Sequence, residues 1–157
     1  MIPPRTPPLA AANVLGFVSG ALTNSGALLA GRYAVVCKSP LTNSWYASNA
    51  GGAFGPMLRS AGFDAILIKG AAARPVYLYL DSGRAEIRDA SKLWGQTITE
   101  AAASLTEETS RDCSYALIGP AGERRHRGAC IINESGSSAG RGCGAVMGAK
   151  NLKAIVL

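Results

Sequence analysis

Two stretches rich in small residues constrain how this chain can fold, because each joins apolar segments through glycines and each carries an arginine. The first covers residues 31–55 and the second covers residues 138–148. Glycine lets backbone groups approach a ligand closely, a helix start offers unpaired N–H groups to an anion, and arginine supplies a forked cation that suits phosphate. The pattern predicts a pair of phosphate-binding loops that share one ligand, which requires the fold to bring the two stretches together.

A second interpretation of these stretches stays open, since glycine runs are ordinary turns in mixed α/β domains. On that interpretation each run only turns the chain, and the two could lie on opposite faces. Neither stretch is a P-loop, because the order Gly-x-x-x-x-Gly-Lys-Ser/Thr is absent and the nearest lysine, Lys150, follows Met147-Gly148-Ala149.

The composition indicates one globular domain. The chain has 157 residues, of which 48% are hydrophobic and 17% charged. Its net charge of +6 suits a polyanionic ligand, a nucleic acid or a membrane surface. The positive charge is spread out except at residues 124–127, and this run lacks the interleaved aromatic residues of a nucleic-acid footprint. We therefore expect a solvated turn there and no nucleic-acid partner.

The cysteines indicate neither a metal cluster nor an exported protein. Cys37, Cys113, Cys130 and Cys143 are too widely spaced for a C-x-x-C signature, so we expect reduced thiols. No charged residue occurs between Arg5 and Arg32, but polar residues and glycines interrupt that stretch too often for a membrane span. We expect a cytoplasmic protein without a membrane partner.

The apolar pattern predicts a mixed α/β (α+β) fold, rich in strands and with largely antiparallel sheets. A Pro-rich arm, residues 1–12, is expected to be loose. Helices are predicted over residues 53–61 and after Thr97, where Thr97 and Glu100 form a capping box. Asp81-Ser82-Gly83 predicts a hairpin turn. Strands are predicted over residues 14–18, 33–37, 64–69, 75–80, 84–88, 115–118, 129–132 and 153–157.

The order of several sequence blocks carries a family resemblance. The blocks are NVLGFVSGALT, GRYAVVCKSPLT, SNAGGAFGPMLRSAGFDAILIKG, ALIGPAGE and AGRGCGAVMGAKNLKAIVL. Together they resemble the N-terminal domain of tungsten-containing aldehyde ferredoxin oxidoreductases. The resemblance covers residues 13–157 and implies that this domain is truncated at both ends.

The resemblance implies a cofactor site. In that family the domain forms a base for two molybdopterins, whose dithiolenes hold the tungsten without a protein ligand. It implies that Arg32 contacts a pterin phosphate and that the backbone carbonyls of Asn49 and Ala139 hold a magnesium ion between the two phosphates. The two halves of the cofactor cradle would be Asn49, Ala50, Gly51 and Gly52, and Ala139, Gly140, Arg141 and Gly142.

Some residues depart from the family pattern. Ser137 and Ser138 stand where the family usually has Arg-Ala, residues 142–144 are one residue short, and residues 124–127 are basic where the family is apolar. The sequence gives no candidate catalytic residue: His126 is expected at the surface, and Glu100, Glu107 and Glu108 on the solvated face of a helix.

The implied function is the oxidation of aldehydes to carboxylic acids with ferredoxin as electron acceptor. The helical domains and the 4Fe–4S cluster of the family are expected outside this chain, in further domains or a separate chain. The isolated chain is therefore expected to be inactive. Two alternatives remain: a non-enzymatic module for some other phosphorylated ligand, and an inactive remnant.

Overall fold

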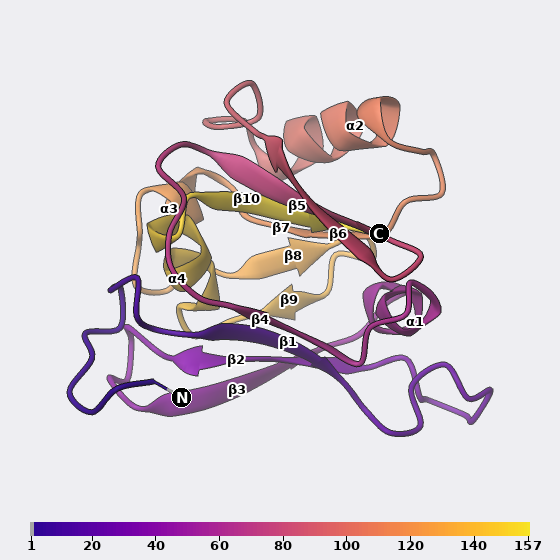
Figure 1. The fold of residues 1–157 in the computed structure, drawn as a ribbon, viewed down its shortest axis with the longest axis horizontal. Helices are drawn as coiled ribbons and strands as arrows, with labels where there is room; N and C mark the ends of the chain where they lie inside the picture. Colours follow the sequence, from indigo (N-terminus) through magenta and orange to yellow (C-terminus); the bar gives the residue numbers. More distant parts are fainter. Residues whose placement is uncertain (1) are drawn as a thin grey trace.

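In the computed structural model, which describes residues 2–157, two sheets enclose a common core (Figure 1). The first sheet has the order β3-β2-β1-β4, and all its neighbours are antiparallel. Its strands are β1 (Leu15–Ser19), β2 (Tyr33–Lys38), β3 (Trp45–Ala50) and β4 (Ala65–Ile68), and helix α1 (Phe54–Ser60) follows β3.

The second sheet has the order β6-β5-β10-β7-β8-β9, and only the pair β10 and β5 is parallel. The strands are β5 (Val76–Asp81), β6 (Arg84–Asp89), β7 (Tyr115–Leu117), β8 (Ile131–Asn133), β9 (Ser138–Ala139) and β10 (Leu152–Val156). The helices are α2 (Ile98–Glu108), α3 (Pro120–Glu123) and α4 (Cys143–Ala149). This arrangement confirms the predicted α+β class with largely antiparallel sheets.

The core lies between the two sheets because the first sheet turns one face of its strands inward, most regularly along β2, where buried and half-buried residues alternate. Phe17 of β1 and Tyr33 and Val35 of β2 point inward and are fully buried, where they meet Ile118 and Ile155 from the second sheet's side. The next residue along each strand points outward. Helix α2 closes a smaller cluster on the other face of the second sheet.

Two local predictions are confirmed. Ser82 and Gly83 both have positive φ, 49° and 75°, as a two-residue hairpin turn between β5 and β6 requires. The Thr97 hydroxyl accepts the Glu100 N–H, and the Glu100 carboxylate accepts the Thr97 N–H at 2.8 Å, which starts α2 with a capping box.

Three expectations were wrong or incomplete. The strand predicted as buried over residues 64–69 is the edge strand β4, and its Leu67 is 63% exposed. Strand β3 was not among the predicted strands, and its last two residues, Asn49 and Ala50, were assigned to a loop. Helix α4 was predicted as a glycine loop, although its glycines serve packing: a Cβ on Gly148 would collide with the Gly122 carbonyl of α3.

The Pro-rich segment contains neither helix nor strand, yet it is tied to the first sheet. The Thr6 carbonyl accepts a hydrogen bond from the Lys38 ammonium at 2.8 Å, and the Asn13 amide donates to the carbonyls of Pro8 and Lys38. Residues 2–12 are therefore an anchored series of turns rather than a loose arm. Among the helices of residues 2–157, none has the length and apolar character needed to cross a bilayer.

Tyr33 occupies an unusual place in this core. Its ring packs on Phe54 with centroids 4.7 Å apart, yet its buried hydroxyl has no hydrogen-bond partner within the described residues. Burial and the negative charge of Glu134 raise the pKa of Tyr33 well above its usual value.

We predict that Tyr33→Phe changes stability little at pH 7, because the lost hydroxyl makes no hydrogen bond. Since the raised pKa keeps the phenol neutral in the folded state, ionisation above pH 10 favours the unfolded state. Between pH 9 and pH 11 the wild-type free energy of unfolding should fall by about 1.4 kcal/mol more than that of Tyr33→Phe. Urea titrations of both proteins measure this, and parallel pH profiles would contradict it.

Candidate functional site

The two small-residue stretches meet along the free edge of β3. The Ser48 hydroxyl of β3 accepts a hydrogen bond from the Gly140 N–H at 3.0 Å, and the Ser137 hydroxyl accepts one from the Gly51 N–H at 2.9 Å. Adding the covalent bonds on either side of the first contact places the Cα atoms of Asn49 and Ala139 within about 12 Å of each other. This is inside the limit of roughly 15 Å for two residues that share one magnesium–diphosphate bridge.

The first stretch is less of a loop than its composition suggests. Asn49 and Ala50 are the last two residues of β3, and Ala50 is fully buried. The first loop is therefore limited to residues 51–53, where Gly52 has a φ of +94°. Asn49 is exposed and points outward from the first sheet, since its neighbours Ser48 and Ala50 point inward.

Arg32 lies at the same end of the sheet as Asn49. It directly precedes β2, is exposed, and one of its guanidinium nitrogens is 3.6 Å from the position of a Cβ built on Gly51. Asn49 pairs with Ala34, two residues after Arg32. Arg32, Asn49 and Gly51 thus form one corner of the outward face of the first sheet.

The second stretch lies beyond the edge of β3. Ala139 ends β9 and is buried, whereas Arg141 is exposed in a left-handed conformation with a φ of 53°. The Arg141 guanidinium lies 5.1 Å from the centroid of the Tyr46 ring. The backbone carbonyl of Arg141 accepts a hydrogen bond from the Ser39 hydroxyl at 2.6 Å. Tyr46 precedes Asn49 by three residues, about 10 Å along β3. Arg32 and Arg141 therefore flank the strand at opposite ends.

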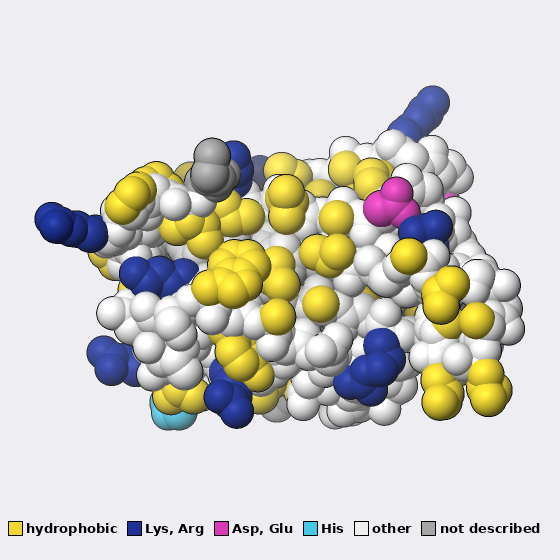
Figure 2. Space-filling model, turned by 90° about the horizontal axis from the view of Figure 1, so that it is seen from below, with side chains coloured by type: hydrophobic (Ala, Val, Ile, Leu, Met, Phe, Trp, Pro, Cys, Tyr) yellow, Lys and Arg dark blue, Asp and Glu magenta, His cyan; other side chains and the backbone are white. Residues whose placement is uncertain are grey.

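The outward face of the first sheet is largely apolar, and we call it the outer face. Figure 2 shows hydrophobic side chains gathered across it with lysine and arginine side chains around them. A Cβ on Gly16 would meet the side chains of Val36 and Leu67, so these two side chains close over that glycine. The alternation of the four strands assigns these residues to the outer face: Gly16, Val18, Ala34, Val36, Lys38, Trp45, Ala47, Asn49, Ala65 and Leu67.

The structure corrects how the backbone N–H groups of the first loop are used. The sequence predicts that they are free for an anion, but Gly51 donates to Ser137 and Ala53 donates to the Glu134 carboxylate at 2.6 Å. The glycines of the second stretch likewise approach protein rather than open space. A Cβ on Gly142 would lie 2.7 Å from the Pro40 ring, and one on Gly144 would lie 2.5 Å from the Cys130 carbonyl oxygen.

Sequence reasoning missed the residues that support the first loop. They belong to the turn between β8 and β9, residues 133–137, which we call the β8–β9 turn. Asn133 and Glu134 contact the first loop from a point more than eighty residues away in the chain. Their only sequence signal is the turn composition Asn-Glu-Ser-Gly, which gives no indication of a partner.

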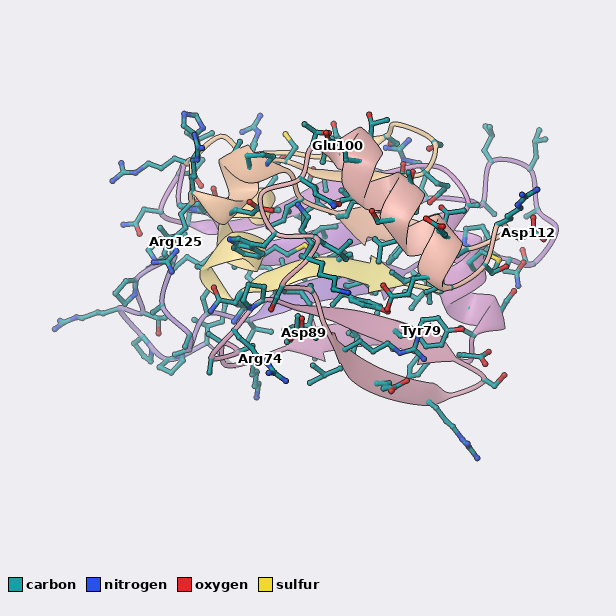
Figure 3. The ribbon with its side chains drawn as sticks, turned by 90° about the horizontal axis from the view of Figure 1, so that it is seen from above. Arg74, Tyr79, Asp89, Glu100, Asp112 and Arg125 are labelled. Atoms are coloured by element: carbon teal, nitrogen blue, oxygen red, sulfur yellow. The ribbon has the colours of Figure 1, made fainter. Side chains whose placement is uncertain are left out.

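The cysteines and acids outside this region form no second site. Cys37 and Cys143 are buried with their sulfurs 3.7 Å apart, so Cys143 faces the core, where contact with Cys37 and burial raise its pKa. Among residues 2–157, no three His, Cys, Asp or Glu side chains are grouped to hold a metal. Asp89, Glu100 and Asp112 point from separate parts of the molecule (Figure 3).

A separate apolar groove of about 410 Å³ lies between β4 and the pair β5 and β6. Ile66, Leu78, Ile87 and Leu152 line it, and the predicted site residues do not. Lys150 at its wall is held by the carbonyls of Ala11 and Gly70. The groove is therefore distinct from the region where the two small-residue stretches meet.

Comparisons with known proteins agree with the fold and the sequence pattern. The family described as "Aldehyde ferredoxin oxidoreductase, N-terminal domain" matches residues 1–157. The tungsten-containing aldehyde ferredoxin oxidoreductases of Pyrococcus abyssi and Pyrococcus furiosus are 49% and 47% identical to the chain over 156 residues. Each match covers 98% of the chain and 26% of the relative.

A solved structure has nearly the same fold. It is described as the active site complex BamBC of benzoyl coenzyme A reductase with 1,5-dienoyl-CoA, and it matches with a TM-score of 0.96 and 40% identity. The match covers 99% of this chain and 24% of that one, so the chain spans about a quarter of its relatives. These relatives are named as oxidoreductases or a reductase. The chain belongs to the aldehyde ferredoxin oxidoreductase family and corresponds to its N-terminal domain.

Proposed function

We propose that this domain seats a tungsten bis-molybdopterin cofactor in an enzyme that oxidises aldehydes to carboxylic acids with ferredoxin as acceptor. The observation that carries the proposal is the meeting of the two small-residue stretches at the edge of an exposed apolar sheet face. Family membership supports the cofactor, since the relatives above are tungsten-containing enzymes.

The residues present fit such a group. The outer face carries mostly small or apolar side chains, which allow a flat ring system to lie close to the sheet. Arg32 and Arg141 are exposed at opposite ends of β3, and neither is in an ion pair within the described residues. Guanidinium groups bind phosphate through paired hydrogen bonds.

In this proposal the residues of the chain bind and orient the cofactor. Arg32 and Arg141 would hold the pterin phosphates, and the carbonyls of Asn49 and Ala139 would hold magnesium. The tungsten centre would supply two-electron redox chemistry, with ferredoxin as the acceptor and an iron–sulfur cluster elsewhere in the enzyme. The enzyme would work in the cytoplasm.

A second candidate reaction is the reduction of an aromatic CoA thioester. It is favoured by the 40% identity to a chain of the benzoyl coenzyme A reductase complex. A third kind of relative, the aliphatic sulfonate oxidoreductase WOR-like subunit of Pyrococcus furiosus, is 35% identical over 97% of this chain. The domain is thus shared by enzymes with different substrates.

We predict that Arg32→Ala lowers the tungsten content of the protein purified from its own host. The loss of one charge-assisted contact to phosphate costs about 2 kcal/mol, roughly a 30-fold weaker affinity. Elemental analysis gives the ratio of tungsten to protein. The control is Arg84→Ala, which removes an exposed arginine from β6 in the second sheet. Equal tungsten in both variants would contradict the role of Arg32.

We predict that the complete enzyme reduces ferredoxin when it is given aldehydes. Spectroscopy of ferredoxin measures the rate with aliphatic and aromatic aldehydes, and the same preparation is tested for reduction of benzoyl-CoA by a strong electron donor. Activity with the CoA thioester and none with any aldehyde would replace the first candidate with the second.

A further inference from the structure

The β8–β9 turn holds the first loop through three hydrogen bonds. The Asn133 amide donates to the Gly51 carbonyl, and the Ser137 hydroxyl accepts the Gly51 N–H at 2.9 Å. The Glu134 carboxylate accepts the Ala53 N–H at 2.6 Å. Three backbone groups of the loop are thus satisfied by three side chains of one turn.

The β8–β9 turn is also held by hydrogen bonds that do not involve the loop. The Asn133 side-chain oxygen accepts hydrogen bonds from the Ser135 N–H at 3.2 Å, the Ser137 N–H at 3.0 Å and the Ser135 hydroxyl at 2.9 Å. The second oxygen of Glu134 accepts the Ser114 hydroxyl at 2.6 Å. Because both side chains are held on their far side, they present a rigid surface to the loop.

The loop lies directly on this surface. Gly52 has a φ of +94°, and a Cβ there would lie 2.8 Å from the Glu134 carboxylate and 2.9 Å from the Asn133 amide nitrogen. Only glycine therefore permits the approach. A hydrogen bond to an ionised carboxylate is about twice as strong as a neutral one, which makes Glu134 the strongest of the three contacts.

Two groups of the candidate site, the Tyr33 hydroxyl and the Arg32 guanidinium, lie close to the loop that Glu134 holds. The unpartnered hydroxyl of Tyr33 lies near Asn133 and Glu134, and an Arg32 guanidinium nitrogen is 3.6 Å from the position of a Cβ built on Gly51. Because Gly51 and Ala53 bond to the β8–β9 turn, and Arg32 is in no ion pair within the described residues, its guanidinium is left for a ligand on the outer face.

We propose that Glu134 is a positioning residue for the cofactor: it holds residues 51–53 in place, so that Arg32 and Asn49 face the bound phosphates. This inference rests on the proposed function, and it adds a residue that does not itself touch the cofactor. If Glu134 only stabilised the fold, any variant that destabilises the fold equally would lose the cofactor equally. A comparison with such a variant therefore separates a positioning role from a purely structural one.

The experiment compares Glu134→Ala with a matched variant, Glu100→Ala, in the protein purified from its host. The Glu100 carboxylate also accepts one backbone N–H and one hydroxyl, both from Thr97 at 2.8 Å, but it caps α2 far from the loop. Three quantities are measured for each: the melting temperature, the hydrogen exchange of residues 51–53, and the tungsten content.

Both variants should lower the melting temperature by a similar few degrees. Only Glu134→Ala should accelerate amide exchange in residues 51–53, by about tenfold for the loss of one charge-assisted contact, and only it should lose tungsten. Glu134→Gln keeps an oxygen that can accept from Ala53, so it should recover part of the tungsten content and part of the exchange protection.

Two results would overturn the inference while the proposed function stands: faster exchange in Glu134→Ala with unchanged tungsten, or an equal loss of tungsten in Glu100→Ala. The absence of tungsten from the wild-type protein would refute the proposed function, and the inference with it.

Discussion

The contact between the edge of β3 and the chain around β9 is the constraint on which the site depends. Two serine hydroxyls make this contact: Ser48 of β3 accepts from the Gly140 N–H just after β9, and Ser137 just before β9 accepts from the Gly51 N–H just after β3. These hydrogen bonds join the first sheet to the second along one side. They also bring together two segments about ninety residues apart, one following Arg32 and the other preceding Arg141.

The first sheet is packed on its inner face, and its outer face is exposed. Its inner face is filled by Phe17, Tyr33 and Val35, whereas its outer face carries small and apolar side chains with Asn49 at one corner. An exposed apolar face of this kind is typical of a binding surface. The fold therefore separates the two tasks of the sheet, since one face stabilises the domain and the other is available for a ligand.

Much of the fold could be predicted because strong local signals coincide with it. The alternation of residues 33–37, the Ser82-Gly83 turn and the Thr97 capping box each have a cause within a few residues. Strand β3 was not predicted because its inward positions, Tyr46, Ser48 and Ala50, do not form an apolar pattern. The inward Ser48 makes a hydrogen bond to Gly140, which is distant in the sequence. Helix α4 was not predicted because its glycines give it the composition of a loop. Gly144 is needed for close contact with Cys130, and Gly148 for close contact with Gly122.

The candidate site was only partly predictable for the same reason. Arg32 and the small-residue stretches carry visible signals, and the structure brings them together. The sequence pattern does not show that the N–H groups of Gly51 and Ala53 are used by Ser137 and Glu134, because those partners lie in a turn of ordinary composition. Local patterns thus point to candidate site residues, while the long-range contacts that hold them become visible only in the folded structure.

The central claim is that the outer face and the two arginines hold a tungsten cofactor, and the position of the metal tests it most directly. Crystals of the protein purified from its own host, measured at the tungsten absorption edge, locate the metal by anomalous scattering. The account predicts a tungsten peak over the outer face, with phosphate density in contact with Arg32. A peak on another surface, or cofactor phosphates that do not contact Arg32, would contradict it.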